Sequence, residues 1–409
     1  MKLFWVLACI DIDAPVGGLA ANMANGPERD EELMGKCTMG RRLTAAILCL
    51  AMTAGLLGGC SMAGETDEEI SSMMPESSSE ISEPESEPES VPEEPEDTGP
   101  RNPLTGEEGF AESAVGLRPV TVMINNIGQA LPQRGLAAAD VIFEAVVEGG
   151  ITRMMGVYAD IDQIPYVGPV RSARHYYVSF SEGLNALYTH FGGSPTAYDY
   201  ISSYGVDDVD GQYCTSAFYQ DTWRAQTYGR EHSFFIDGET IRAQAESEGI
   251  SLEGEYQPLF DFSYGEVLVP EDGVADDVFV PFSGSYNAEF FYDETTGVYT
   301  KYRNGQEHID ADTEEVITFE NVLILYTTVT ALGDGSERRN LDLSSGSGWY
   351  VSAGGREEIS WEKGGVEDPF VFTDSDGQPL VANVGKTYIC LTDKGYASSV
   401  TFTNDTTEG

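Results

Sequence analysis

The chain has 409 residues, of which 41% are hydrophobic and 11% aromatic, so it is long enough for two ordinary domains with buried cores. It carries 69 acidic and 22 basic side chains, and the resulting formal net charge of −47 repels nucleic acid and anionic lipid head groups at long range. This balance excludes nucleic acid as a partner and favours high solubility as the plain explanation of the charge.

A lipoprotein export signal is predicted at residues 39–59. Arg41 and Arg42 precede the almost wholly apolar segment 43–57, and two glycines then lead into Cys60. A basic start, an apolar stretch of about 7–15 residues and small residues before the cut are typical of a secretory signal. A transmembrane helix needs about 20 apolar residues, and this run is shorter. The end of the signal resembles a bacterial lipobox, so we expect lipid on the thiol of Cys60.

This signal predicts a protein anchored in the cell membrane by its lipid, on the extracytoplasmic face. Residues 1–38 fit poorly in front of a signal because they include a charged stretch at 28–32, and they are interpreted as a misplaced upstream start.

Residues 60–100 are predicted to be a disordered linker. Ser, Glu and Pro dominate, and fourteen acidic residues and no basic one lie between positions 65 and 97. Such a segment cannot bury enough apolar area to offset the entropy of ordering it. At about 3.1 Å per residue in a polyproline-like chain, it reaches on the order of 100 Å. We therefore expect a globular part held away from the membrane.

Residues 101–255 are predicted to form an α/β-type domain, because strand-like and helix-like segments alternate along them. Segments 141–147 and 151–158 predict a hairpin around the glycine-containing turn between them. Asp237 is placed to cap a helix that runs through Ala245. The other predicted elements are a buried strand at 120–124, a helix at 172–185 with Ser172 as its N-cap, and a strand at 187–191.

Residues 275–395 are predicted to form a mostly β domain, sandwich-like or barrel-like, with 396–409 as a flexible tail. Short aromatic and β-branched runs recur between turns, and almost no helix is predicted. The fold class is therefore α+β. Cys214 and Cys390 fall in different predicted domains, so a disulfide between them is not favoured. The predicted strands are 277–282, 288–292, 298–302, 322–329, 349–352, 358–361, 370–373 and 387–391.

A series of motifs runs in order through nearly all of 101–395. In the first domain they are PLTG at 103–106, RPVTVMINN at 118–126, ADVIFE at 139–144, EGGITR at 148–153, GPVRSAR at 168–174 and HFGGS at 190–194. In the second they are YD at 292–293, YR at 302–303, NV at 321–322, GSG at 346–348, ISW at 359–361 and GKT at 385–387. Together they resemble the YerB-like bacterial lipoproteins, whose two domains have no assigned function.

This resemblance implies a fold and a location but no reaction. The sequence departs from the family pattern at 230–233, where a Pro is expected before His232 and an Asn after it. No role is therefore assigned to His232.

Arginines are concentrated in the first domain. Between residues 38 and 300 there is no Lys, whereas Arg118, Arg134, Arg153, Arg171 and Arg174 fall within 57 positions. The rigid donor fork of Arg suits carboxylate or phosphate.

We therefore predict one pocket for an anionic or glycan ligand of the cell envelope, with Arg153, Arg171 and Arg174 as donors. Polar residues predicted near them at strand ends are Asn125, Glu144, His190 and Ser194. The alternative is that the arginines form internal ion pairs with Asp140, Glu144 and Glu148.

Catalysis is a weaker hypothesis, with His190 and Asp140 as the candidate residues. His190 and Ser194 could form a base and nucleophile, with oxyanion donors from Gly192 and Gly193. No Gly-x-Ser-x-Gly elbow is present, however.

Metal and cofactor sites are not predicted. The Asp-rich segments 207–211 and 374–377 resemble fragments of calcium loops, but neither has the acidic residue that closes a 12-residue loop, and both are interpreted as turns.

Three functions remain open. The first is a binding protein for an anionic or glycan envelope ligand. The second is a hydrolase or phosphoryl-transferase that acts on envelope polymers. The third is a scaffold or chaperone for other envelope proteins, whose identity the sequence does not indicate.

Overall fold

The computed structural model describes residues 99–254 and 258–404. The predicted signal, Cys60 and nearly all of the predicted linker lie outside the described residues. Within them, no helix combines the length and the apolar character that a membrane crossing requires.

The first region alternates strands and helices, as predicted. Strands β2 (Val141–Val146) and β3 (Thr152–Tyr158) pair antiparallel and confirm the predicted hairpin. Short 3-10 turns lie at Glu112–Ala114, Gly128–Ala130, Glu148–Gly150, Ile161–Gln163, Thr215–Ala217, Arg230–His232 and Lys394–Ser399. The strands and helices are β1 (Val120–Asn125), β2 (Val141–Val146), β3 (Thr152–Tyr158), α1 (His175–Glu182), β4 (Leu187–His190), α2 (Pro195–Tyr204), β5 (Asp208–Asp210), β6 (Tyr219–Gln220), α3 (Thr222–Tyr228), β7 (Phe234–Phe235) and α4 (Gly238–Glu248).

The helix starts show where local sequence signals act. Asp237 accepts a hydrogen bond from the backbone N–H of Thr240 and caps α4, which confirms that prediction. The predicted cap at Ser172 is wrong, because α1 begins only at His175 and its N-cap is Arg174, whose side chain makes no capping bond.

The second region is almost entirely β, and every strand predicted there is present. Its strands are β8 (Asp261–Ser263), β9 (Gly273–Val274), β10 (Asp277–Pro281), β11 (Asn287–Asp293), β12 (Val298–Arg303), β13 (Gln306–Glu307), β14 (Thr318–Phe319), β15 (Asn321–Thr327), β16 (Val329–Ala331), β17 (Arg339–Leu341), β18 (Ser345–Ser352), β19 (Gly355–Lys363), β20 (Phe370–Thr373), β21 (Val381–Asn383), β22 (Thr387–Asp393) and β23 (Thr401–Thr403).

Two predictions for turns and tail need correction. Residues 208–210 form the edge strand β5, which pairs with β4, and not a turn. The predicted flexible tail contains β23, which pairs with β10, and Phe402 of β23 packs against Trp349 with ring centroids 5.4 Å apart. The segment 374–377 is a turn, as predicted.

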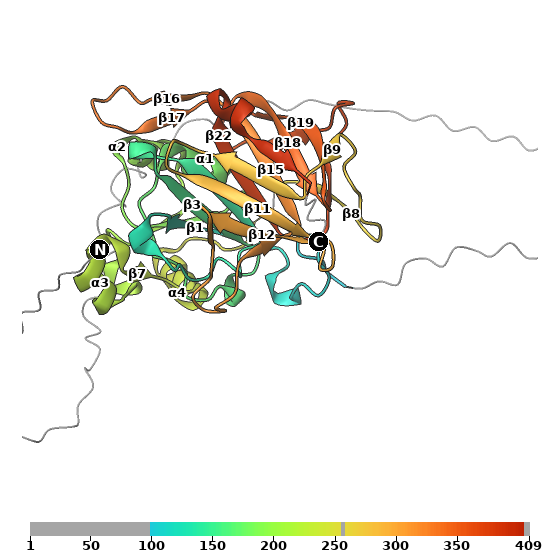
Figure 1. Cartoon of the computed structure of the whole chain (residues 1–409). Coiled ribbons are helices and arrows are strands. Elements are labelled where there is room, and N and C mark those ends of the chain that lie inside the picture. The colour runs from blue at the N-terminus through green and yellow to red at the C-terminus, as the bar shows by residue number, and fades with distance from the viewer. Residues whose placement is uncertain (1–98, 255–257, 405–409) are drawn as a thin grey trace, which may run out of the picture. The chain divides into compact units, whose positions relative to one another are not determined.

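One ten-stranded sheet unites the two regions (Figure 1). Its strand order is β20-β19-β18-β15-β22-β2-β3-β1-β4-β5. The junction is a parallel pairing in which Val141 to Ala145 of β2 align with Thr387 to Leu391 of β22. Strands far apart in sequence therefore lie side by side at the centre of the sheet. A second, six-stranded sheet contains β10, β11 and β12.

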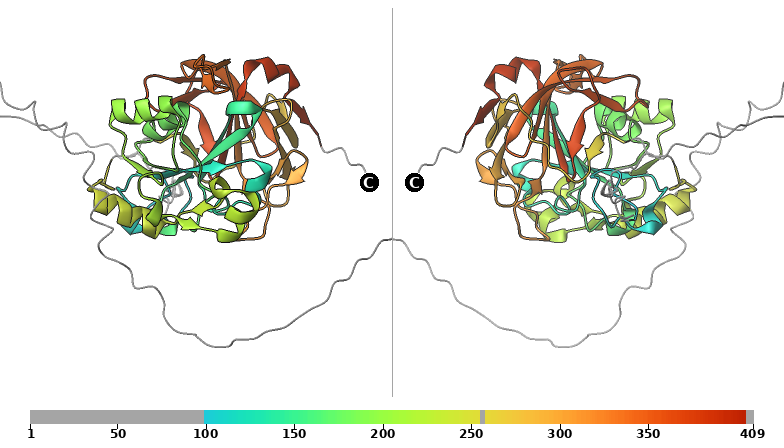
Figure 2. Two further views of the ribbon diagram at one scale, coloured as in Figure 1. Left: turned by 90° about the vertical axis from the view of Figure 1, so that its left-hand side faces the viewer. Right: turned by 90° about the vertical axis from the view of Figure 1, so that its right-hand side faces the viewer.

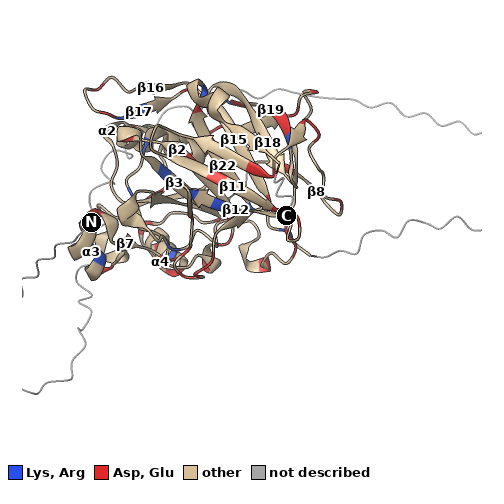
Figure 3. Cartoon of the chain, in the orientation of Figure 1, with Lys and Arg blue, Asp and Glu red and all other residues tan. Residues whose placement is uncertain are grey.

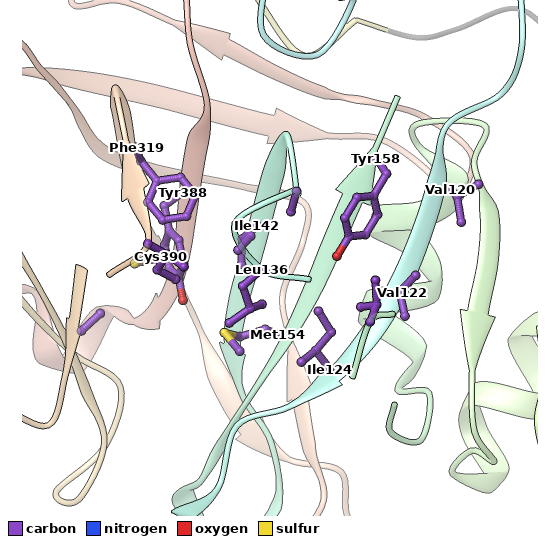
Figure 4. Packing of buried hydrophobic residues seen from close by; sticks show 14 of the residues in the cluster. Val120, Val122, Ile124, Leu136, Ile142, Met154, Tyr158, Phe319, Tyr388 and Cys390 are labelled. Atoms are coloured by element: carbon purple, nitrogen blue, oxygen red, sulfur yellow. The ribbon is translucent and has the colours of Figure 1, made fainter. Parts of the chain in front are cut away.

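The two faces of the large sheet pack against different partners. On one face, Ile142 and Tyr388 belong to a cluster with Phe290 of the second sheet (Figure 4). On the other face, Phe143 packs with Phe180 of α1, in the cluster that also contains residues of α2. Figure 2 shows these green helices beside the sheet strands. Because β2 is buried on both faces, its sequence is a nearly continuous apolar run.

Cys214 and Cys390 are both buried and are not joined by a disulfide.

Candidate anion-binding pocket

A cavity of about 540 Å³ lies where the parallel strands β4 and β5 end. Phe191, Gly192 and Gly193 line it directly after β4, and Gln212 and Tyr213 line it after β5. In open α/β sheets, ligands bind outside the carboxyl ends of parallel strands. The remaining lining residues are Val170, Arg171, Ser172, Tyr198, Arg230, Glu231 and Phe234.

Arg171 is the exceptional cation of this pocket. Its Nε is buried without a hydrogen-bond partner, and within the described residues its guanidinium makes no hydrogen bond and no ion pair within 4.0 Å. Burial lowers the pKa of Arg171, and the nearby carboxylate of Glu231 opposes that shift. A guanidinium remains charged under such conditions and offers five N–H donors, so Arg171 has donors available for an anion in the cavity.

Arg153 and Arg174, by contrast, are occupied by protein partners. Nε of Arg174 lies 2.9 Å from one oxygen of Glu148, and its Nη2 donates to the other. Arg153 is 3% exposed, donates to the carbonyl of Ser172 at 2.5 Å, and lies 3.4 Å from Glu148. Burial would raise the pKa of Glu148, but the hydrogen bond and charges of both arginines outweigh it and hold that pKa at about 2. These two arginines therefore form an internal ion-pair cluster.

Asn125 and His232 meet beside the pocket although 107 residues separate them in sequence. Nδ2 of Asn125 lies 2.8 Å from Nδ1 of His232, which is the geometry of an amide donating to a neutral ring. Burial lowers the pKa of His232, and the charge of Arg171 lowers it further. The structure thus brings His232, to which the sequence assigns no role, close to Arg171.

His190 is held between two acceptors beneath the pocket wall. Its Nδ1 lies 2.8 Å from the carbonyl of Gly192, and its Nε2 lies 3.1 Å from Oδ2 of Asp208. Burial alone would lower the pKa of His190, but the bond to Asp208 and the charges of Asp208 and Asp210 outweigh burial and raise it. Both ring nitrogens of His190 therefore face acceptors, an arrangement that favours the protonated ring.

Asp210 forms a cluster with His190 and Asp208, and its carboxylate hydrogen-bonds to the pocket lining. Its Oδ1 accepts from the backbone N–H groups of Gly192, at 2.7 Å, and Gln212, at 2.8 Å. Its Oδ2 accepts from the hydroxyl of Tyr198 at 2.8 Å. Ligand atoms of His190, Asp208 and Asp210 lie close enough together for a metal ion. In the structure these atoms hydrogen-bond to Gly192, Gln212, Tyr198 and one another, so the cluster positions the pocket lining.

Ser194 acts at a helix start. Its hydroxyl oxygen accepts from the N–H of Ala197 at 3.1 Å and caps α2, with Pro195 in the first turn. Ser194 is 3% exposed, and no hydrogen bond joins it to His190 among the described residues. The arrangement does not present an activated nucleophile to the cavity.

The family model described as "Protein of unknown function (DUF3048) N-terminal domain" matches residues 104–251, and its C-terminal counterpart matches 278–389. A Bacillus subtilis (strain 168) protein named "Putative lipoprotein YerB" is 31% identical over 305 residues, which cover 73% of this chain and 88% of that protein. The chain belongs to the YerB-like lipoprotein family.

The YerB-like fold is also seen in a crystal structure of YerB protein from Bacillus subtilis. It matches with a TM-score of 0.65 and 27% sequence identity, over 75% of this chain and all of the other. The YerB-like architecture is therefore an α/β region followed by a mostly β region, as the sequence predicts.

Glu144 of this YerB-like chain lies away from the pocket, between the two sheets. It accepts hydrogen bonds from Asn126, Thr152 and Tyr388, and its Oε2 lies 3.8 Å from Nζ of Lys301. Glu144 is 1% exposed and Lys301 is fully buried. The structure thus makes Glu144 part of a saturated interior network.

Asp140 and His190 lie at opposite ends of the strands of the large sheet. Asp140 precedes β2 and His190 ends β4, and these strands run in the same direction. Asp140 accepts from Asn102 and from the N–H of Ala159, beside a separate cavity of about 360 Å³. Burial raises its pKa to about 6. The sheet therefore does not bring the two proposed catalytic residues together.

Several lining residues were not predicted from the sequence. Arg230 and Glu231 come from a 3-10 turn, and Arg230 stacks over Phe234 with its guanidinium carbon 4.9 Å from the ring centroid. Tyr198 and Tyr213 pair as aromatic neighbours with centroids 6.3 Å apart. The sequence could have indicated only the lining residues that directly follow a predicted strand, because ligand-binding residues gather at strand ends.

Proposed function

We propose that this protein is a lipid-anchored binding protein on the extracytoplasmic face of the cell membrane. Its pocket would hold the anionic group, a phosphate or a carboxylate, of an envelope ligand. The lipobox-like sequence at Cys60 and the lipoprotein name of the Bacillus subtilis relative support the anchor.

The observation that carries the binding proposal is the open guanidinium of Arg171. Its Nε is buried without a partner beside a cavity, and Arg230 adds a second cation against the single acid Glu231. Buried polar groups without partners are rare in folded proteins, and those that exist need an explanation. An anion held by the fork of Arg171 would supply the missing acceptor.

The pocket favours binding over hydrolysis. Both ring nitrogens of His190 are engaged by Gly192 and Asp208, and the hydroxyl of Ser194 caps a helix, so neither side chain is placed to act as base or nucleophile in the cavity. Aromatic walls from Phe191, Tyr198 and Tyr213 suit the apolar face of a sugar attached to the anionic group.

Thermal melting of the full chain tests this proposal. The probes are glycerol 3-phosphate, N-acetylglucosamine 1-phosphate and a muropeptide, with Ca²⁺ as a cation control. A ligand that binds only the folded state should add about 2.7 kcal/mol at 100 times its dissociation constant. We expect one anionic probe to stabilise the parent and Arg242→Gln, whose half-buried side chain pairs with Asp162 and lines no part of the pocket, but not Arg171→Gln.

Two results would count against the proposal. If no probe raises the melting temperature of the parent, the pocket does not bind this class of ligand, and crosslinking to protein partners becomes the next experiment. If Arg171→Gln responds as the parent does, the anion binds elsewhere. Release of free phosphate or of a cleaved muropeptide would instead support an enzyme.

A further inference from the structure

We propose a second binding site, for a neutral saccharide, in a cleft between α2 and the hairpin of β16 and β17. The cleft encloses about 520 Å³ and shares no lining residue with the pocket of Arg171. Figure 1 shows the hairpin beside α1 and α2. The helix α2 contributes to both sites, with Tyr198 in the pocket and Tyr200 and Tyr204 in the cleft.

Aromatic rings form one wall of the cleft. The rings of Tyr200 and Tyr204 lie 5.7 Å apart, and the ring of His175 lies 5.3 Å from that of Tyr200. Tyr204 is 43% exposed although it is a large aromatic residue. Rings of this kind combine apolar area with a polar tip, so they suit a ligand with C–H faces and hydroxyl edges.

Uncommitted hydrogen-bonding groups also line the cleft. Nε2 of His175 lies 2.9 Å from Oδ1 of Asn340, and burial lowers the pKa of His175, so the neutral ring donates to that oxygen. This bond leaves Nδ2 of Asn340 without a partner among the described residues. The hydroxyls of Thr328, Tyr200 and Tyr204 likewise make no hydrogen bond there. Each of these hydroxyls can donate or accept, as a sugar hydroxyl does.

The charges of the cleft are balanced or already satisfied. Nζ of Lys363 donates to the carbonyls of Gly365, Val366 and Asp368 at 2.8, 2.9 and 2.6 Å. These three bonds use all the donors of an ammonium group. The carboxylate of Asp342 is the other charge of the lining, and its Oδ1 accepts from Ser344. An anionic ligand would find no open cation here, so the cleft favours a neutral, polyhydroxylated ligand.

Saturation-transfer NMR and calorimetry on the full chain test the inference. The probes are maltotriose and triacetylchitotriose as neutral trisaccharides, and glycerol 3-phosphate as the anionic contrast. We expect saturable binding of at least one trisaccharide. Tyr204→Ala should weaken it by about three- to tenfold through loss of the aromatic contact. Asn340→Asp keeps the oxygen that accepts from His175 but removes the free amide donor, and should weaken it by about tenfold.

Two control variants separate this site from the rest of the molecule. Trp223→Ala removes an exposed aromatic residue of α3 that lines neither cavity, and should leave trisaccharide binding unchanged. Arg171→Gln should also leave it unchanged, which distinguishes a failure here from a failure of the proposed anion site. The inference is overturned if neither trisaccharide binds, if only the phosphate binds, or if Tyr204→Ala and Asn340→Asp bind as the parent does.

Discussion

The interior network around Glu144 and the pocket around Arg171 both contain charged side chains. Only the network supplies its central charged group with hydrogen-bonding partners. Glu144 has donors from three polar side chains and a nearby ammonium, whereas Arg171 has no acceptor among the described residues. Figure 3 shows the basic residues of β3 and β12, which include the buried Arg153 and Lys301. Charge alone therefore does not mark a site. The difference lies in whether the protein itself completes the hydrogen bonding of each charged group.

The largest expected effect comes from breaking the interior network. Glu144→Gln removes the negative charge that lies 3.8 Å from Nζ of the buried Lys301, whose hydrogen-bonding partner remains Nδ1 of His308, 3.0 Å away. Removal of one partner of a buried pair costs about 3–5 kcal/mol, so the free energy of unfolding should fall by that amount. Urea denaturation measures it, and Glu294→Gln in an exposed turn should change it by less than about 0.5 kcal/mol. A loss below about 1 kcal/mol would show that the charge of Glu144 contributes little to holding Lys301 in the interior.

The cluster beneath the pocket should give a smaller, pH-dependent effect. The pKa of His190 is raised in the folded state, so its stabilisation is complete below the unfolded pKa of about 6.5 and is lost as pH rises through the folded value. Asp208→Asn should lower the free energy of unfolding at pH 6 by about 2–3 kcal/mol and flatten this dependence. Denaturation between pH 5 and 9 measures both, with exposed Asp162→Asn as control. An equal loss at every pH would contradict a charged His190.

A still smaller effect is expected from the cap of α2. Ser194→Ala removes the acceptor for the N–H of Ala197, so the free energy of unfolding should fall by about 1 kcal/mol. Ser202 lies exposed on the same helix, and Ser202→Ala should change stability by less than about 0.5 kcal/mol. Chemical denaturation of the two variants gives the comparison. If Ser194→Ala is as stable as the parent while an anionic probe no longer binds, Ser194 contacts the ligand instead.

The smallest effect on stability should come from Arg171 itself. Arg171→Gln removes a charged group that has no partner, so the free energy of unfolding should stay within about 1 kcal/mol of the parent. Arg153→Gln, the matched variant within the ion-pair cluster, should lose about 3 kcal/mol because the buried side chain contacts both Glu148 and Ser172. Equal losses in the free energy of unfolding would show that Arg171 and Arg153 do not differ in how far protein partners stabilise them.

Local patterns predicted most of the secondary structure but little of the site. Apolar runs and turn residues sufficed for the hairpin of β2 and β3 and for the strands of the second region. The sequence of β5 resembles an incomplete calcium loop and so predicts a turn, while the role of its two acids beside His190 depends on the neighbouring strand. The Ser194-Pro195 pair is a start signal that local reasoning could have used for α2.

The sequence could not predict which arginines form ion pairs and which one faces the cavity, because this depends on non-local geometry. Arg153 and Arg174 reach Glu148 from a neighbouring strand and a helix start, while Arg171, three positions before Arg174, faces the cavity. The contact between Asn125 and His232 joins the end of β1 to a distant turn. No periodicity in the sequence encodes either arrangement, because periodicity reports which face of an element is buried and not what lies opposite.

The position of β22 has a consequence for how the chain folds. This strand is made late, yet it lies between β15 and β2 at the centre of the large sheet. Until residues 387–393 are available, β2 and β15 would each expose an unpaired edge, which favours aggregation. Pairing of β2 with β22 also closes a loop of more than 200 residues, a long-range contact of the kind that slows folding. Truncations before β22 should therefore prevent closure of the sheet in both regions, and the chain presents two unpaired edges until its last central strand arrives.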